Sequence, residues 1–305
     1  MILIMRYDSS GMDEYDVRIE GLGFGYTEDR LILDGVELRI GGPQLISIIG
    51  PNGVGKSTLI YCMNKILSPV EGKVYIQSRD VTEISIRDLS KIMGFVPHAT
   101  SDVFPMTVMD TVLMGRHPKS GRKITEEDVR KAYAILEDLG IGELAMRPFD
   151  QLSAGQHQKV VLARGLAQEP DILLLDEPTS NLDIKHQMEV SRILKERSAS
   201  LGMTVIMISH DLNIAAKYSD HVIMLYDGGI FRIGTPEEVI TEDNIHEVYG
   251  VESKVVIDEG RPHVIVRDPL FDPSIRSENS ICTRRRGLLR HRTPIRFVAF
   301  FSAPY

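Results

Sequence analysis

Residues 45–58 read LISIIGPNGVGKST, an apolar run followed at once by a glycine-rich turn and then by Lys56, Ser57 and Thr58. The second part matches the pattern G-x-x-x-x-G-K-[S/T], with a strand-like run before it and a helix-forming run, TLIYCMNKIL, after it. Glycines let the backbone turn tightly, and the N–H groups of such a turn form a cradle for a phosphate. The stretch therefore predicts a phosphate-binding loop between a buried strand and a helix.

The residue types of this loop suit a nucleotide. Lys56 brings a positive charge toward the β- and γ-phosphates, and the Ser57 hydroxyl can ligate Mg²⁺. A chance glycine turn is the alternative interpretation, but it explains neither the strand before the turn nor the helix after it. The loop residues assigned to nucleotide binding are Gly50, Pro51, Asn52, Gly53, Val54, Gly55, Lys56, Ser57 and Thr58.

A second motif is acidic: DILLLDEPTSNLD, at residues 171–183, is an apolar run that ends in two adjacent acids. Asp176 is expected to hold Mg²⁺, directly or through water, and Glu177 to orient or deprotonate an attacking water. An ordinary acidic loop at the end of a strand is the alternative, and the phosphate loop upstream argues against it.

A third motif, ISHDLN at residues 208–213, again follows an apolar run. A lone histidine such as His210 is more often structural or on the surface. Open α/β sheets, however, bind ligands at the carboxyl ends of their parallel strands. We therefore expect the loops that carry Gly50, Glu177 and His210 to meet at one edge of a sheet.

The apolar pattern of the chain favours an α/β fold. Four short runs, at residues 45–49, 172–175, 204–208 and 221–225, lack a clean polar–apolar alternation. This is typical of strands buried on both faces of a parallel sheet. Between about residues 88 and 165 the apolar runs become helical or irregular, so we interpret this stretch as a helical insertion in the α/β core.

Two helices have clear signals. Residues 125–140, TEEDVRKAYAILEDLG, combine Thr125 as N-cap, Asp128 three residues later, and Gly140 as a stop. The run after Asp183, IKHQMEVSRILKERSA, contains no Pro or Gly and has an amphipathic pattern.

Composition narrows the function classes. The 305 residues are 43% hydrophobic and carry a formal net charge of −8, which argues against bulk binding of nucleic acid. Cys62 and Cys282 form no metal-ligand spacing and indicate no disulfide framework, so a reducing cytosol is expected. No apolar run approaches the roughly twenty residues of a membrane span. If the protein works at a membrane, another chain must supply the membrane-spanning segments.

In order and in context, these motifs resemble those of the ATP-binding cassette (ABC) ATPases, over roughly residues 15–250. LSAGQ at residues 152–156 is similar to the family's signature motif, with Ala154 in place of the usual first glycine. SNLD at residues 180–183 is similar to the family's D-loop, and His210 falls on its switch histidine.

The resemblance implies further nucleotide-contacting residues. Tyr26 lies 24 residues before Gly50 and matches the aromatic residue that stacks on adenine in the family. Ser153 suits a helix N-cap, and a helix start with bare amides can hold a phosphate. In the family this helix start reads the γ-phosphate of a nucleotide held by a second chain. The other residues implied here are Gly155, Gln156 and Asp183.

The implied fold is α/β, with a P-loop NTPase core of mainly parallel sheet, an N-terminal antiparallel β subdomain and an inserted helical subdomain, within residues 14–270. The implied ligands are ATP and Mg²⁺, the latter on Ser57 and Asp176. The implied catalytic residues are Glu177, His210 and His98. Two copies of the chain are expected to pair head to tail, so that Ser153 of one copy faces the ATP held by the other.

One residue departs from the family pattern. His98, in FVPHATSD, stands where the family usually has a glutamine that approaches Mg²⁺ and the attacking water. A neutral imidazole can accept a hydrogen bond at one nitrogen and donate one at the other. Because Mg²⁺ prefers oxygen ligands, we expect a contact with water rather than direct coordination. A loop residue that points to solvent or to a membrane partner is the alternative.

Two segments are similar to the importer ATPases for iron-siderophore, haem and cobalamin uptake: FPMTVMDTVLMGRHP, at 104–118, and GTPEEVITEDNIHEVYGV, at 234–251. They predict an ATP-hydrolysing subunit, peripheral on the cytoplasmic face of the membrane. Its partners would be polytopic permease subunits and, indirectly, an extracytoplasmic substrate-binding protein. The alternatives are a soluble ABC ATPase, such as an iron–sulfur cluster assembly factor, and a non-enzymatic nucleotide-sensing module.

The tail at residues 271–305 has a different composition. It carries seven arginines and no lysine, against Asp272 and Glu278 as its only acids. A disordered, solvated tail is the main interpretation. Contact with anionic lipid or a partner protein, and a chance extension, are the alternatives.

Overall fold

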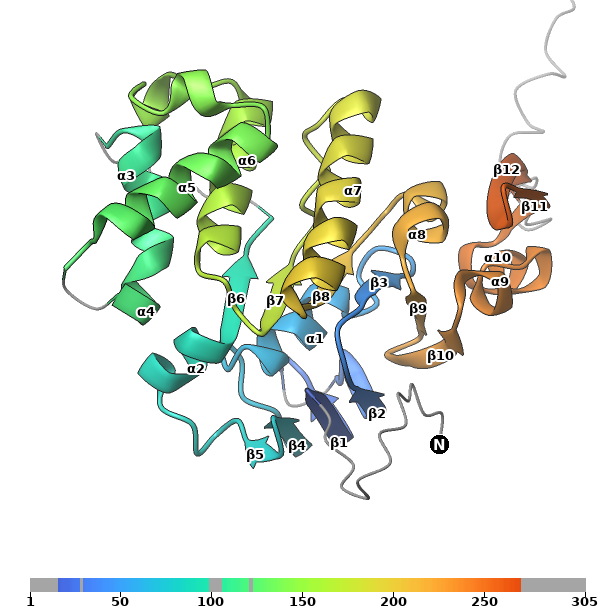
Figure 1. The fold of residues 1–305 in the computed structure, drawn as a ribbon. Helices are drawn as coiled ribbons and strands as arrows, with labels where there is room; N and C mark the ends of the chain where they lie inside the picture. The colour runs from blue at the N-terminus through green and yellow to red at the C-terminus, as the bar shows by residue number, and fades with distance from the viewer. Residues whose placement is uncertain (1–15, 28–29, 99–105, 121–122, 270–305) are drawn as a thin grey trace, which may run out of the picture. The chain divides into compact units, whose positions relative to one another are not determined.

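The computed structural model describes residues 16–27, 30–98, 106–120 and 123–269 (Figure 1). The strands are β1 (Val17–Phe24), β2 (Leu33–Ile40), β3 (Leu45–Ile49), β4 (Glu71–Ile76), β5 (Arg79–Asp80), β6 (Met93–Val96), β7 (Ile172–Leu175), β8 (Thr204–Ile208), β9 (His221–Tyr226), β10 (Gly229–Gly234), β11 (Val251–Asp258) and β12 (Arg261–Pro269). The α-helices are α1 (Lys56–Met63), α2 (Ile86–Ile92), α3 (Val108–Leu113), α4 (His117–Ser120), α5 (Glu126–Asp138), α6 (Ala154–Ala167), α7 (Ile184–Leu201), α8 (Leu212–Tyr218), α9 (Pro236–Val239) and α10 (Glu242–Tyr249).

The central sheet has six strands in the order β10-β9-β3-β8-β7-β6. The pairs β9/β3, β3/β8, β8/β7 and β7/β6 are parallel, and only β10 runs antiparallel to its neighbour β9. The four apolar runs of the sequence form β3, β7, β8 and β9, so the predicted strands are confirmed. Since the parallel strands end at the same edge, the loops after β3, β6, β7 and β8 all begin there.

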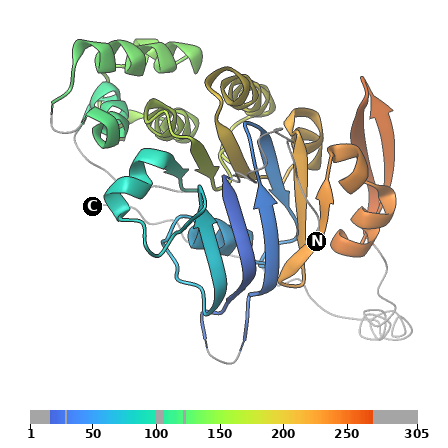
Figure 2. The ribbon, with the colours of Figure 1, turned by 60° about the horizontal axis from the view of Figure 1, so that its bottom comes forward.

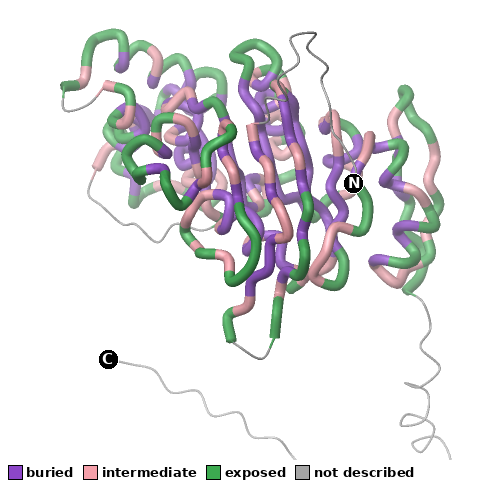
Figure 3. Tube along the Cα trace, turned by 90° about the horizontal axis from the view of Figure 1, so that it is seen from below, coloured by how far each residue is buried: buried purple, intermediate pink, exposed green. Residues whose placement is uncertain are grey.

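Both faces of the central sheet are buried, which is why its strands show no polar–apolar alternation. In β8, Ile206 and Ile208 belong to a core shared with α1 and the N-terminal strands. Val205 and Met207, on the other face, belong to a second core shared with α3, α5, α6 and α7. Figure 3 shows the resulting run of buried positions along the strands.

A separate antiparallel sheet, in the order β2-β1-β4-β5, confirms the expected antiparallel β subdomain (Figure 2). Val17 of β1 pairs with Ile40 of β2 on one side and with Ile76 of β4 on the other. These strands share a core with Leu59 and Ile60 of α1. Helix α1, which follows the phosphate loop, therefore packs against both sheets.

The helical insertion begins later than the sequence pattern indicated. Within the proposed range of residues 88–165, β6 belongs to the central sheet, where Met93 pairs with Ile172 and Val96 with Leu175. Its four residues, MGFV, are too few for periodicity to distinguish a strand from part of a helix. The helices α3, α5 and α6 follow β6 and pack together through a core that includes Val112, Leu136 and Leu162.

The predicted helix signals are confirmed. Thr125 and Asp128 form a reciprocal capping box at the start of α5, and Gly140 adopts φ 65° after its end. The side chain of Asp183 accepts a hydrogen bond from the N–H of His186 at the start of α7. No helix in the described part of the chain is long and apolar enough to cross a membrane. The arginine-rich tail at 271–305 and Cys282 lie outside the described residues.

Candidate functional site

The phosphate loop requires its glycines. Gly50, Gly53 and Gly55 have φ angles of 145°, 80° and 98°, in the range that favours glycine. A Cβ atom on Gly50 would lie 2.3 Å from the backbone carbonyl oxygen of Leu225 in β9, so this position has no room for a side chain. Asn52 is exposed, Val54 is partly buried and Thr58 is buried.

The Lys56 side chain lies within this loop. Its Nζ atom donates hydrogen bonds to the backbone carbonyls of Gly50 and Pro51, each at 2.7 Å. Burial lowers the pKa of Lys56 from its usual value, and the negative charges of Glu177 and Asp176 oppose that shift. The loop thus combines a nest of backbone amides with a positive charge that is poorly solvated.

Asp176, at the end of β7, is 2% exposed and faces two hydroxyl groups of α1. Ser57 donates to its Oδ1 atom at 3.0 Å, and Tyr61 donates to its Oδ2 atom at 2.9 Å. Ser57 and Asp176 were both predicted for this site. Tyr61 was not, although it stands four residues after Ser57 and hence on the same helix face.

Glu177 brings the catalytic candidates together. Its Oε1 atom contacts Nε2 of His210, and its Oε2 atom lies 3.3 Å from Nδ1 of His98. His98 Nδ1 is also 3.3 Å from the hydroxyl of Ser180. Glu177 has φ 52°, a left-handed backbone conformation that is uncommon outside glycine and is concentrated at functional sites.

Tyr26 follows strand β1 of the antiparallel sheet and lies next to the end of the phosphate loop. Its hydroxyl is 3.4 Å from the hydroxyl oxygen of Thr58, and its ring packs edge-on against Phe24 at 5.1 Å between centroids. The residue is 63% exposed. A ring supported on one edge with an open face can stack on a planar ligand.

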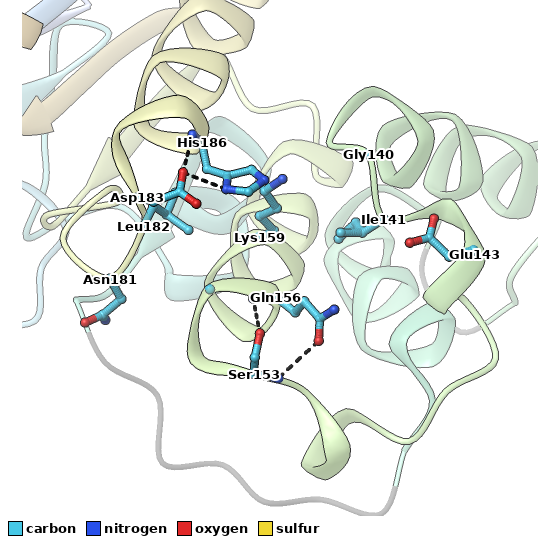
Figure 4. A pocket seen from close by; sticks show the side chains of 11 residues that line it. Gly140, Ile141, Glu143, Ser153, Gln156, Lys159, Asn181, Leu182, Asp183 and His186 are labelled. Atoms are coloured by element: carbon cyan, nitrogen blue, oxygen red, sulfur yellow. Dashed lines mark hydrogen bonds and ion pairs between the residues drawn. The ribbon is translucent and has the colours of Figure 1, made fainter.

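A cavity of about 320 Å³ lies between the starts of α6 and α7 (Figure 4). It is lined by the predicted residues Ser153, Gly155, Gln156 and Asp183, and by Gly140, Ile141, Glu143, Lys159, Asn181, Leu182 and His186. No residue of the phosphate loop lines this cavity in the structure. Ser153 and Gln156 form a reciprocal capping box at the start of α6.

Two further residues, one that lines this cavity and one at the phosphate loop, were not assigned a role from the sequence. Lys159 is buried in α6, and its Nζ donates to the Leu139 carbonyl at 3.0 Å; burial lowers its pKa. Tyr249, at the end of α10, has its hydroxyl hydrogen-bonded to the backbone of Gly50, and burial raises its pKa far above the usual range. Both contacts join residues distant in the chain, so no local pattern signals them.

Comparison with known proteins decides the family. A family model described as ABC transporter matches residues 33–180. An uncharacterized ABC transporter ATP-binding protein of Methanocaldococcus jannaschii is 41% identical over 247 residues, covering 81% of this chain and 96% of that protein. The chain belongs to the ABC transporter family.

This ABC transporter protein is therefore an ATP-binding protein, with an ATPase activity coupled to transport. It is also 38% identical to the iron(3+)-hydroxamate import ATP-binding protein of Bacillus subtilis, over 78% of this chain and 89% of that protein. Among solved structures, one assigned to a metal-chelate type ABC transporter in an inward-facing conformation matches with a TM-score of 0.70. The two are 27% identical, over 86% of this ABC chain and 99% of the other.

Proposed function

We propose that this chain is the ATP-hydrolysing subunit of an importer that takes up an iron chelate, haem or cobalamin. The observation that carries the proposal is the similarity to the iron-hydroxamate import protein, which extends over most of both chains. The match to the metal-chelate type structure supports the same class of cargo. Polytopic permease subunits and an external substrate-binding protein would complete the importer, with this chain peripheral on the cytoplasmic face of the membrane.

The phosphate loop and Tyr26 would bind ATP. The amides of residues 50–58 and the start of α1 provide donors and partial positive charge for the phosphates. Lys56 would exchange its contacts with the Gly50 and Pro51 carbonyls for the phosphate oxygens. The exposed face of Tyr26 would stack on adenine, because its ring lies beside Thr58 at the end of the loop.

Ser57 and Asp176 would hold Mg²⁺. Their hydroxyl and carboxylate oxygens already lie within 3.0 Å of each other, and such hard oxygen donors suit this ion. When bound, Mg²⁺ supplies positive charge that neutralises the phosphates. Asp176 is buried at the end of β7, so its carboxylate is held beside Ser57 and cannot rotate into solvent.

Glu177 would orient or deprotonate the attacking water. Its carboxylate contacts His210 on one oxygen and His98 on the other, which restricts its rotation. His210 and His98 would help hold the water and the γ-phosphate in line with it.

The cavity of Ser153, Gly155, Gln156 and Asp183 would serve a second copy of the chain. Its lining includes no phosphate-loop residue of the same chain, and the amides at the start of α6 suit a phosphate. In a head-to-tail dimer, this cavity would complete the nucleotide site of the partner. Closing on ATP and opening after hydrolysis would then drive transport as a two-state switch.

The test is purification with the membrane proteins encoded beside this chain. The expected result is a stable complex with a polytopic protein that hydrolyses ATP and, in vesicles with the binding protein, accumulates a ferric chelate, haem or cobalamin. Lys56→Ala should abolish both activities and leave the complex intact. Failure to associate with any polytopic protein, with ATPase activity retained, would refute the importer and favour a soluble ABC ATPase.

A further inference from the structure

Tyr61 connects three parts of the site. It lies in α1, one turn after Ser57, and its hydroxyl donates to Oδ2 of Asp176 at 2.9 Å. Its ring packs edge-on against Phe95 of β6, with 5.8 Å between ring centroids and an interplanar angle of 90°. β6 is the strand that leads to His98. A single side chain of the phosphate-loop helix therefore contacts both the end of β7 and the adjacent strand.

Each oxygen of the Asp176 carboxylate accepts a hydrogen bond from a different hydroxyl group. Ser57 donates to Oδ1 and Tyr61 to Oδ2, and the i,i+4 spacing places both hydroxyls on one face of α1. The proposed function also gives Ser57 a second task, as a metal ligand. A hydroxyl can offer an oxygen lone pair to a cation while its proton still bonds Oδ1, and the Tyr61 hydroxyl remains the donor to Oδ2.

The burial of Asp176 explains why a second donor is needed. A carboxylate that is 2% exposed needs donors for both of its oxygens, because an unsatisfied buried charge is costly.

We propose that Tyr61 is a positioning residue for the metal ligand Asp176, with its hydroxyl holding Oδ2 so that Oδ1 stays directed toward Ser57. This inference rests on the proposed Mg²⁺ site. It assigns the effect to the hydroxyl group and not to the packing of the ring. Partners that orient a metal ligand typically contribute about 10- to 100-fold to metal affinity.

The test is Tyr61→Phe, which removes the hydroxyl and keeps the ring. Binding of a fluorescent ATP analogue is measured while Mg²⁺ is titrated, and again in excess EDTA. We expect the Mg²⁺ midpoint of Tyr61→Phe to rise by about 10-fold or more. The affinity in EDTA should stay at the parent value, because the phosphate loop and Tyr26 are unchanged.

Two variants serve as controls. Tyr133→Phe removes a hydroxyl from an exposed tyrosine of α5, and Phe95→Leu removes the ring contact while keeping the Tyr61 hydroxyl. Both should keep the parent Mg²⁺ midpoint. A raised midpoint in Phe95→Leu would overturn the assignment to the hydroxyl, and it would do so even if Tyr61→Phe proved insoluble.

The remaining outcomes separate this inference from the proposed function. If the parent binds the analogue with a clear Mg²⁺ dependence and Tyr61→Phe has the same midpoint, Tyr61 does not position Asp176, and the proposed function stands. If Tyr61→Phe loses affinity equally with Mg²⁺ and in EDTA, the residue shapes the whole loop and the inference is wrong. If the parent shows no Mg²⁺ dependence, the proposed metal site is wrong, and the role of Tyr61 with it.

Discussion

His98 and Glu177 face each other across neighbouring strand ends, with 3.3 Å between Nδ1 of the histidine and Oε2 of the carboxylate. The other carboxylate oxygen contacts Nε2 of His210. The three residues follow β6, β7 and β8, which are adjacent in the central sheet. The carboxylate thus has an imidazole on each of its oxygens.

His98→Ala should lower ATP turnover by about 10- to 100-fold, the value of a lost hydrogen bond to a charged group. ATP binding should be retained, because His98 does not contact the phosphate loop in the described contacts. His98→Gln should preserve most of the turnover, since an amide can replace one imidazole contact. Steady-state hydrolysis and nucleotide titration of the three proteins provide the measurement. Equal turnover of His98→Ala and the parent, with and without the permease, would remove His98 from the catalytic site.

Glu177→Gln should bind ATP as the parent does and lose hydrolysis by roughly 10²- to 10⁴-fold, the usual contribution of a general base. The variant should also accumulate as an ATP-bound dimer, because the nucleotide that joins the two copies is not removed. Size-exclusion chromatography with light scattering, in ATP and Mg²⁺, measures the dimer directly. A purely monomeric profile under these conditions would contradict the head-to-tail arrangement.

Ser153→Arg should abolish ATPase activity by filling the cavity at the start of α6 while leaving ATP binding to the phosphate loop intact. Because Ser153 also caps α6, the matched control is Ser153→Ala. That control loses the cap, at a cost of about 1 kcal/mol in stability, but adds no bulk to the cavity. It should keep substantial activity. Wild-type activity in Ser153→Arg would refute a role for this cavity in the partner's site.

Mixing Ser153→Arg with Lys56→Ala tests whether the site forms between two chains. Each mixed dimer has one composite site that carries both lesions and one that carries neither. If one intact site can act, the mixture should regain activity that neither pure variant has. ATPase rates across a series of mixing ratios measure this recovery. Activity that stays at the level of the pure variants at every mixing ratio would contradict a site that forms between two chains and acts singly.

Asp128→Asn should destabilise the helical insertion in a pH-dependent way. Asp128 is buried, and the backbone N–H of Thr125, the hydroxyl of Ser120 and the guanidinium of Arg116 hold its pKa far below the usual range. This stabilisation is fully present above the unfolded-state pKa of about 3.9 and is lost as pH falls below it. The parent should exceed Asp128→Asn in unfolding free energy by about 1.5–3 kcal/mol at pH 7.

The measurement for Asp128 is denaturant unfolding at pH 7, 5 and 3. The gap between parent and variant should be the same at pH 7 and 5 and should narrow toward pH 3. Glu126→Gln, at an exposed position in the first turn of the same helix, is the control and should show almost no gap at any pH. A gap that stays constant down to pH 3 would show that the ionised carboxylate is not its source.

Most of the fold was predictable because its signals are local. The four buried strands were visible as apolar runs, and the caps at Thr125, Ser153 and Asp183 follow from side chains that bond to amides within the same turn. β6 was missed for the opposite reason. Its four residues carry no periodicity of their own, and they form a strand only because the exposed edge of β7 pairs with them.

The sequence by itself determined the phosphate loop, the acidic pair Asp176 and Glu177, and the meeting of their loops at one sheet edge. These follow from residue types at short spacings and from the direction of parallel strands. Only the tertiary structure decided that Tyr61 bonds to Asp176, that His98 contacts Glu177, and that the Ser153 cavity excludes the loop of its own chain. Each of these relationships is between side chains about 80 residues or more apart in the sequence. Only the packing of the folded chain sets the spatial distance between them.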